Sequence, residues 1–394
     1  MSTETKNFEF SGGIKKVSLG LMLVGIFAFA MSFFLDKYVG WVDFYVMALY
    51  FTTISLSGIY WLSLTGVIQA SWMTPYKRVV EAMTSFLPIS FMMFIGMCFG
   101  LHKIYEWTHK DIVMNDPILR GKVAWLNEPR FIGTMIVMFL LWIGISVIFK
   151  RFSERMDGQN GVAAANNLVG FSAISLVVFA FTVSIFAFDW VMSVEPHWFS
   201  TIFGVYIFAG IATSGLAFIT IAVIKLKDWG YFGDAVNENH LHDLGKWMFG
   251  MSVFWAYIWV SQYILIWYAN IPEETEYYVL RHNHWNALFI FNFCINFGLP
   301  FFVLMTRKAK RSPKVLMFVA FAILIGHYID MYVMLAPKVF EHHNLHISGN
   351  GILQALQVLG GFGLFIFVVG RSLSKRNLMA VKDPTFSEGS HLHQ

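Results

Sequence analysis

Long runs of apolar residues alternate with short polar segments along most of this 394-residue chain. A helix needs about 20 apolar residues, at roughly 1.5 Å of rise each, to cross the hydrocarbon core of a membrane. Ten stretches reach this length: 14–35, 41–70, 78–101, 130–150, 165–188, 198–224, 246–270, 284–306, 315–337 and 350–371. The pattern therefore predicts an all-α integral membrane protein with about ten transmembrane helices.

The polar segments divide the chain into three parts. Residues 1–13 and 372–394 are predicted to be terminal segments, and residues 14–371 the membrane domain. Within that domain, residues 102–129 form a longer connection that mixes charges with Trp107, Ile112 and Trp125. This mixture predicts a surface hairpin or an interfacial helix, because aromatic and charged side chains gather at membrane boundaries.

Basic residues predict the direction of the helices, because cytoplasmic loops of membrane proteins are rich in Lys and Arg. If the N-terminus is assigned to the cytoplasm, 20 of the 28 basic residues fall in inner segments. The outer segments hold the other eight: Lys37, Lys103, Lys110, Arg120, Lys122, Arg130, Arg281 and Lys338. We therefore expect both termini on the cytoplasmic side.

Composition excludes several classes of protein. Apolar residues make up 57% of the chain and charged residues 13%, about half the charged share of a soluble domain. A net charge of +4 gives no support for a nucleic-acid partner, whereas lipids are expected partners. Cys98 and Cys294 stand alone in apolar runs, so we predict no metal site, iron–sulfur cluster or covalently bound cofactor built from this chain.

Two pairs of segments suggest an internal duplication. Trp41, Phe51 and Ser57-Gly58 recur as Trp198, Phe208 and Ser214-Gly215, and Asp189, Pro196 and Phe199 recur as Asp330, Pro337 and Phe340. Four helices separate the partners, so matching helices run in the same direction, as in parallel repeats. We predict repeat halves at about 41–197 and 198–340. They would form two four-helix bundles, helices 2–5 and 6–9, with helices 1 and 10 flanking them.

Ionisable residues near the outer side are the first functional candidates, because charge inside a membrane is costly and often functional. They are Asp43, Asp189, Glu195, His197, His327 and Asp330. Asp330 lies about fifteen residues, or roughly 22 Å of helix rise, from the inner start of its span. His327 shares its helical face, and a carboxylate beside an imidazole can exchange protons. The alternative is a His–Asp pair that only holds helices together.

Further polar residues extend this hypothesis toward the inner side. Glu81 is the candidate for proton uptake from the cytoplasm. Gln262, Asn292 and Asn296 are candidates to line a hydrated path, and Asn292 and Asn296 lie one turn apart on one face. Such residues equally form hydrogen bonds between neighbouring helices.

Three motifs carry a resemblance to a known family. Residues 188–199 read Phe-Asp-Trp-Val-Met-Ser-Val-Glu-Pro-His-Trp-Phe, residues 240–246 read His-Leu-His-Asp-Leu-Gly-Lys, and residues 266–268 read Ile-Trp-Tyr. Over essentially its whole length the chain resembles the NrfD/PsrC-like membrane subunits of bacterial alternative complex III. It is most similar to the second of the two, the ActF type, or quinol:cytochrome c oxidoreductase quinone-binding subunit 2.

The resemblance implies a respiratory complex of the bacterial inner membrane that oxidises menaquinol and passes electrons to cytochrome c or to an oxidase. It implies the family fold of two four-helix bundles with flanking helices. Haem c and iron–sulfur clusters are then expected only in partners: the sister NrfD-like subunit, an iron–sulfur/molybdoenzyme-like subunit and cytochrome c subunits, with a terminal oxidase as a further candidate. The family's quinol site is best established in the sister subunit, so menaquinol is only a candidate ligand here.

Two other functions compete with this one. A secondary transporter also combines parallel repeats with buried acids. Helices broken near mid-membrane in both halves would favour this alternative. Pro88 and Pro300 do not lie in corresponding helices. A scaffold subunit of the same complex would use its acids only for pairs between helices.

Overall fold

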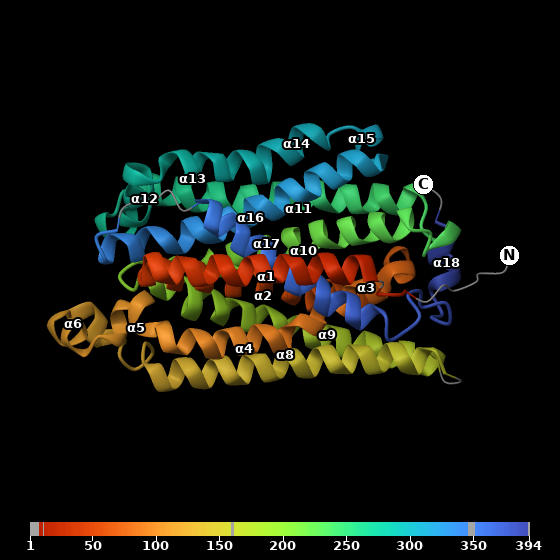
Figure 1. Cartoon of the computed structure of the whole chain (residues 1–394), viewed down its shortest axis with the longest axis horizontal. Helices are drawn as coiled ribbons and strands as arrows, with labels where there is room; N and C mark the ends of the chain where they lie inside the picture. Colours follow the sequence, from red (N-terminus) through yellow and green to blue (C-terminus); the bar gives the residue numbers. More distant parts are fainter. Residues whose placement is uncertain (1–7, 11, 159–160, 346–350, 393–394) are drawn as a thin grey trace.

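The computed structural model describes residues 8–10, 12–158, 161–345 and 351–392, most of which lie in helices (Figure 1). Within these residues, ten helices are long and apolar enough to cross a membrane, which confirms the predicted number. Seven of them are continuous α-helices: α1 (Gly12–Leu35), α2 (Lys37–Val67), α8 (Glu128–Met156), α10 (Phe203–Asp228), α11 (Glu238–Ala269), α16 (Pro313–His342) and α17 (Gly351–Leu373).

The other three spans contain tighter or wider turns. The third is built from η1 (Ser71–Tyr76), α3 (Lys77–Met83), η2 (Thr84–Phe86), α4 (Leu87–Met97), η3 (Cys98–Gly100) and α5 (Leu101–Ile104). The fifth joins α9 (Gly161–Phe186) to η5 (Ala187–Val191) and η6 (Met192–Val194), and the eighth contains α13 (Asn286–Phe293), η8 (Cys294–Gly298) and α14 (Leu299–Val303). Pro88 and Pro300 lie in the first turns of α4 and α14, where a missing N–H is tolerated.

Shorter helices lie at the two ends of the bundle. α5, α6 (Lys110–Asn115) and α12 (Pro272–His284) lie at one end, and α3, α15 (Arg307–Arg311) and α18 (Phe386–Ser390) at the other (Figure 1). Segments assigned to the inner side by their basic residues therefore share one end. Between α5 and α8, residues 102–129 form η4 (Glu106–Thr108), α6 and α7 (Pro117–Lys122), and α6 packs against α7 as a short helical hairpin.

The centre of the protein is formed by α2 and α10, which pack against each other and both contact α9 and α16. Residues 48–63 of α2 and 211–220 of α10 are all buried, as expected for helices that are apolar on every side. Gly215 allows this close approach, because a Cβ there would lie 1.7 Å from Ser57 Oγ.

The first and last spans, α1 and α17, pack mainly against each other. They meet at Gly25 and Gly360, where a Cβ built on Gly360 would lie 2.4 Å from Gly25 Cα. Small residues at such a crossing are typical of helix pairs in membranes, because they let two backbones approach closely.

The sixth span begins later than the sequence predicted. It was expected to open at Trp198, but α10 begins at Phe203, whereas Trp41 already lies within α2. The Trp198 ring instead stacks on Tyr277 of α12 at 4.1 Å, and its Nε1 donates to Glu274 O at 3.1 Å. These contacts hold Trp198 in the turn before the helix, so the two matched tryptophans occupy different local structures.

Candidate functional site

Asp330, on α16, is only 3% exposed, and its carboxylate accepts hydrogen bonds from three other helices. Oδ1 accepts from Asn292 Nδ2 of α13 at 2.7 Å and from the Tyr206 hydroxyl of α10. Oδ2 accepts from Trp255 Nε1 of α11 at 3.1 Å. In the described ranges no Lys or Arg forms an ion pair with Asp330, so its partners are neutral donors and one histidine.

Asn296 extends this network along the eighth span. Its Nδ2 donates to Asn292 Oδ1 at 2.6 Å, which confirms that the two asparagines face the same way. Asn296 lies on the wide turn η8, and its Oδ1 comes so close to α16 that a Cβ on Gly326 would lie 2.3 Å from it. A larger residue at position 326 would therefore displace the Asn296 side chain.

His327 lies one turn before Asp330 on α16, with Nδ1 3.9 Å from Asp330 Oδ2. Its Nε2 is buried and has no hydrogen-bond partner among the residues described. Both side chains line a cavity of about 10 Å³ that is also lined by Thr53 of α2 and Ser214 of α10. Such a volume has room for about one water molecule.

This arrangement is suited to proton exchange. An ionised carboxylate buried without a cation is costly, while three hydrogen-bond donors stabilise the ionised form. A neighbouring imidazole and a cavity able to hold one water then provide groups to which a proton could pass.

Asp189 is in a different environment, although the sequence pairs it with Asp330. It lies on η5 and is 1% exposed, and Arg130 Nη2 is 2.9 Å from its Oδ2. Trp125 Nε1 donates to Oδ1 at 2.9 Å, and the Arg130 guanidinium carbon lies 3.5 Å from the centre of the Trp125 ring. Asp189 is therefore held by a fixed cation.

Glu195 is also paired with an arginine, Arg281. From the sequence, this arginine is predicted only to lie in an outer segment. Arg281 of α12 is fully buried, and its Nη2 lies 2.6 Å from Glu195 Oε1. It also donates to Val333 O at 3.0 Å and Met334 O at 2.8 Å, just beyond Asp330 on α16. Burial raises the pKa of Glu195 and the Arg281 guanidinium opposes that rise. Arg281 thereby links α12 to α16 and to Glu195, which follows η6.

The remaining outer candidates lie in separate contacts. His197 Nε2 is 2.5 Å from Asp116 Oδ2, and this hydrogen bond lowers the pKa of Asp116. Asp43 of α2 is fully buried and accepts from Ser32 Oγ at 2.9 Å and Gln354 Nε2 at 3.0 Å, between α1 and α17. Of the predicted outer residues, the structure thus brings together only His327 and Asp330.

Gln262 does not join the two asparagines. Its Nε2 donates to the Tyr278 hydroxyl at 3.0 Å, and its Oε1 accepts from Ser200 Oγ at 3.0 Å. Conversely, Tyr206 and Trp255 bind Asp330 directly but are not among the residues predicted from the sequence. No sequence signal distinguishes them, because the chain contains 15 Tyr and 14 Trp.

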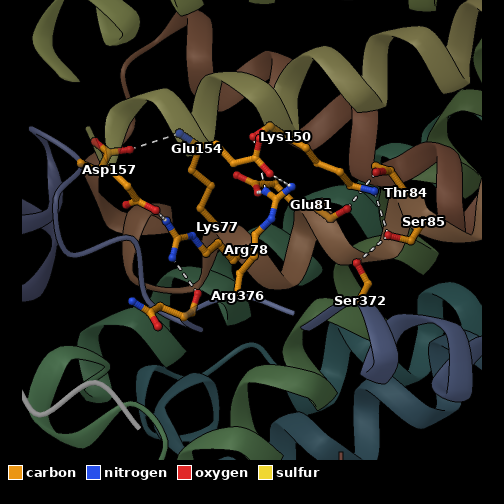
Figure 2. A network of polar contacts seen from close by, with 12 residues as sticks. Lys77, Arg78, Glu81, Thr84, Ser85, Lys150, Glu154, Asp157, Ser372 and Arg376 are labelled. Carbon is orange, nitrogen blue, oxygen red and sulfur yellow. Dashed lines mark hydrogen bonds and ion pairs between the residues drawn. The ribbon is translucent and has the colours of Figure 1, made fainter. Parts of the chain in front are cut away.

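Glu81 lies in a polar cluster (Figure 2), and α3, which carries it, lies at the opposite end of the bundle (Figure 1). It is 3% exposed, with Oε2 3.9 Å from Arg376 Nη1, and Oε1 has no hydrogen-bond partner among the described residues. Glu81 lines a pocket of about 190 Å³ that also contains Lys150 and Ser85. Water can therefore approach a buried carboxylate from the end of the bundle predicted to be cytoplasmic.

No group of three or more His, Cys, Asp or Glu side chains in the described part of the chain is placed to hold a metal ion. No protein-family model and no curated protein matches the chain. Over the ranges that the structure describes, the fold is helical, with ten apolar helices that are compatible with a multi-pass membrane protein.

Proposed function

We propose that this chain is a membrane subunit of a respiratory quinol:electron-acceptor oxidoreductase of the alternative complex III type, similar to its ActF subunit. In this proposal the chain supports menaquinol oxidation by moving protons, and Asp330 is the residue that binds and releases them. Haem c and iron–sulfur clusters belong to partner subunits, and menaquinol is a candidate ligand of this chain.

The observation that carries the proposal is the pairing of the buried carboxylates. Arginines hold Asp189 and Glu195, whereas Asp330 is held by Tyr206, Trp255 and Asn292, which are all neutral. A neighbouring arginine favours the charged form of a carboxylate and, as at Glu195, opposes the effect of burial. Asp330 has no such cation in the described ranges, and so it is the outer acid best suited to change protonation state during turnover.

A proton route between Glu81 and Asp330 would have to pass α2. Ser55 Oγ donates to Met83 O, two residues after Glu81, and Thr53 lines the cavity beside Asp330 and His327. Residues two apart on a helix point to opposite sides, so in this proposal water joins the two hydroxyl groups between the Glu81 pocket and Asp330. Glu195 and Arg281 then hold the outer end of α16 in place.

We also infer that both termini face the cytoplasm of a bacterium and that α2–α9 and α10–α16 form two repeat-related bundles. Support comes from the basic residues at the end that contains α3, α15 and α18 (Figure 1). It also comes from similar packing in the two halves, since α2 packs on α9 as α10 packs on α16.

The transporter alternative is less well supported. Among the described residues, the spans with interruptions are the third, fifth and eighth. Under the predicted duplication, the partners of these spans are the seventh, ninth and fourth, which are the continuous helices α11, α16 and α8. Paired broken helices, the feature expected of an inverted or parallel transporter repeat, are therefore lacking in these ranges.

Co-purification from native membranes tests the class of protein. A tag on this chain should recover partner subunits that contain multihaem cytochrome c and iron–sulfur clusters, identified by their optical and electron paramagnetic resonance spectra. Recovery of this chain as a lone polytopic protein, under detergent conditions that keep other respiratory complexes intact, would contradict the proposal. If the complex is recovered, proton release by the Asp330→Asn variant separates a proton-transferring subunit from a scaffold.

A further inference from the structure

The pocket that contains Glu81 has a second feature, which proton uptake does not explain. Its wall is formed by α3, η2, α8, α17 and the segment after α17, and its volume is about 190 Å³. Four of its lining residues are basic, Arg78, Lys150, Lys375 and Arg376, and Glu81 is the single acid among them. The lining therefore has a large excess of positive charge.

Carboxylates outside the lining neutralise only part of this charge. Arg78 Nη2 lies 2.5 Å from Asp157 Oδ2, and Arg376 Nη2 forms an ion pair with Glu154 (Figure 2). In the described ranges neither Lys150 nor Lys375 forms an ion pair with a carboxylate. The two lysines are thus the charges in this pocket that lack a counter-ion.

Lys150 is the more informative of the two, because it is partly buried. Its Nζ donates to Ser85 Oγ at 2.8 Å, and Ser85 Oγ donates in turn to Ser372 Oγ at 2.7 Å (Figure 2). The direct hydrogen-bond partner of this ammonium is therefore a neutral hydroxyl, and the Glu81 carboxylate attracts it only at longer range. Withdrawing an ammonium from water without an anion costs free energy, and a bound anion would offset that cost.

The position of the pocket indicates where such an anion comes from. Lys150 directly follows the apolar run of α8, and Val147 and Ile148 just before it are exposed, as expected for contact with acyl chains. Lys150 therefore lies at the depth of lipid headgroups, at the end of the bundle where basic residues gather. Basic pockets between helices at the cytoplasmic boundary suit anionic headgroups.

We propose that this pocket binds the phosphate group of an anionic phospholipid, with Lys150 and Lys375 as its main cationic contacts. The hydroxyl groups of Ser85 and Ser372 can reorient to donate to the phosphate oxygens. The phosphate chemistry is shared with free inorganic phosphate, and the headgroup depth favours the lipid. This proposal does not depend on the quinol complex, because it uses only the charges and position of the pocket.

The test uses the full-length chain, alone or in its native complex, after removal of lipid by detergent exchange. Phosphatidylglycerol, phosphatidylcholine or inorganic phosphate is added back, and bound lipid is counted by native mass spectrometry. Phosphatidylglycerol should bind more tightly than phosphatidylcholine, whose choline cancels the phosphate charge. Since each lysine near a membrane surface contributes about fivefold in affinity, Lys150→Gln with Lys375→Gln should weaken phosphatidylglycerol binding roughly 30-fold.

Lys314→Gln is the matched control, because Lys314 is an exposed lysine at the start of α16 and does not line the pocket. It should leave phosphatidylglycerol binding unchanged. The Lys375→Gln single variant keeps the test valid if loss of Lys150 prevents folding, since Lys375 is exposed and should still reduce binding about fivefold.

Three results would overturn the proposal. They are unchanged lipid binding in the double variant, an equal loss in Lys314→Gln, and equal binding of phosphatidylglycerol and phosphatidylcholine. If millimolar inorganic phosphate displaces phosphatidylglycerol from the wild type but not from the double variant, the phosphate site is supported and its natural ligand is assigned to the free ion.

Discussion

Replacing Asp330 with Asn preserves the size of the side chain but removes its charge and one acceptor. The remaining oxygen can still accept from Asn292 and Tyr206. The new Nδ2 would face Trp255 Nε1, and because both are donors this hydrogen bond is lost. Losing one hydrogen bond to a charged group costs about 1.5–3 kcal/mol. That corresponds to a factor of roughly 10 to 150 in the unfolding equilibrium constant.

The functional effect should be far larger than this loss of stability, because Asn cannot bind and release a proton at this site. We expect the purified complex with Asp330→Asn to lose proton transfer, measured as protons released per quinol oxidised in liposomes. Asp189→Asn is the matched control, since its carboxylate is equally buried but is held by Arg130. Arg130 is 22% exposed, so this variant should cost roughly 2 kcal/mol, between the values for exposed and buried pairs.

Two outcomes would refute the reasoning about Asp330. Normal proton release by a stable Asp330→Asn complex would leave only a scaffold role for this residue. In the other outcome, proton release falls in proportion to thermal stability in both Asp189→Asn and Asp330→Asn. That result would assign the loss of proton release to impaired folding. Proton loss confined to Asp330→Asn at similar stability supports the proposal.

Thermal unfolding in detergent checks two further predictions. Arg281→Gln should destabilise the protein by about 3–5 kcal/mol, because it leaves Glu195 buried without its cation, and adding Glu195→Gln should recover part of that loss. Additive losses in the double variant would argue against the pair. Gly215→Ala should cost about 1–3 kcal/mol, because its Cβ would overlap Ser57, whereas Gly133→Ala meets no atom within 4 Å and should cost nothing. Equal melting temperatures for the two alanine variants would contradict the close packing of α2 on α10.

Much of the fold could be predicted from the sequence, because a membrane-spanning helix is specified locally by the length of an apolar run. The ten helices and the facing of Asn292 and Asn296 follow from such local rules, and both are present in the structure. The start of α10 does not follow from them. It is set by contacts of Trp198 with α12, a helix that comes more than 70 residues later in the chain.

The sequence alone treats Asp189 and Asp330 as equivalents, each followed by a proline and a phenylalanine at the same spacing. Only the tertiary structure separates them, because the charge of a buried acid depends on side chains that are distant in the chain. Arg130 reaches Asp189 across 59 positions, whereas Trp255 and Tyr206 reach Asp330 across 75 and 124. Composition and periodicity determined that acids lie within the helices. Helix packing decided which of them is held by arginine and which by neutral donors.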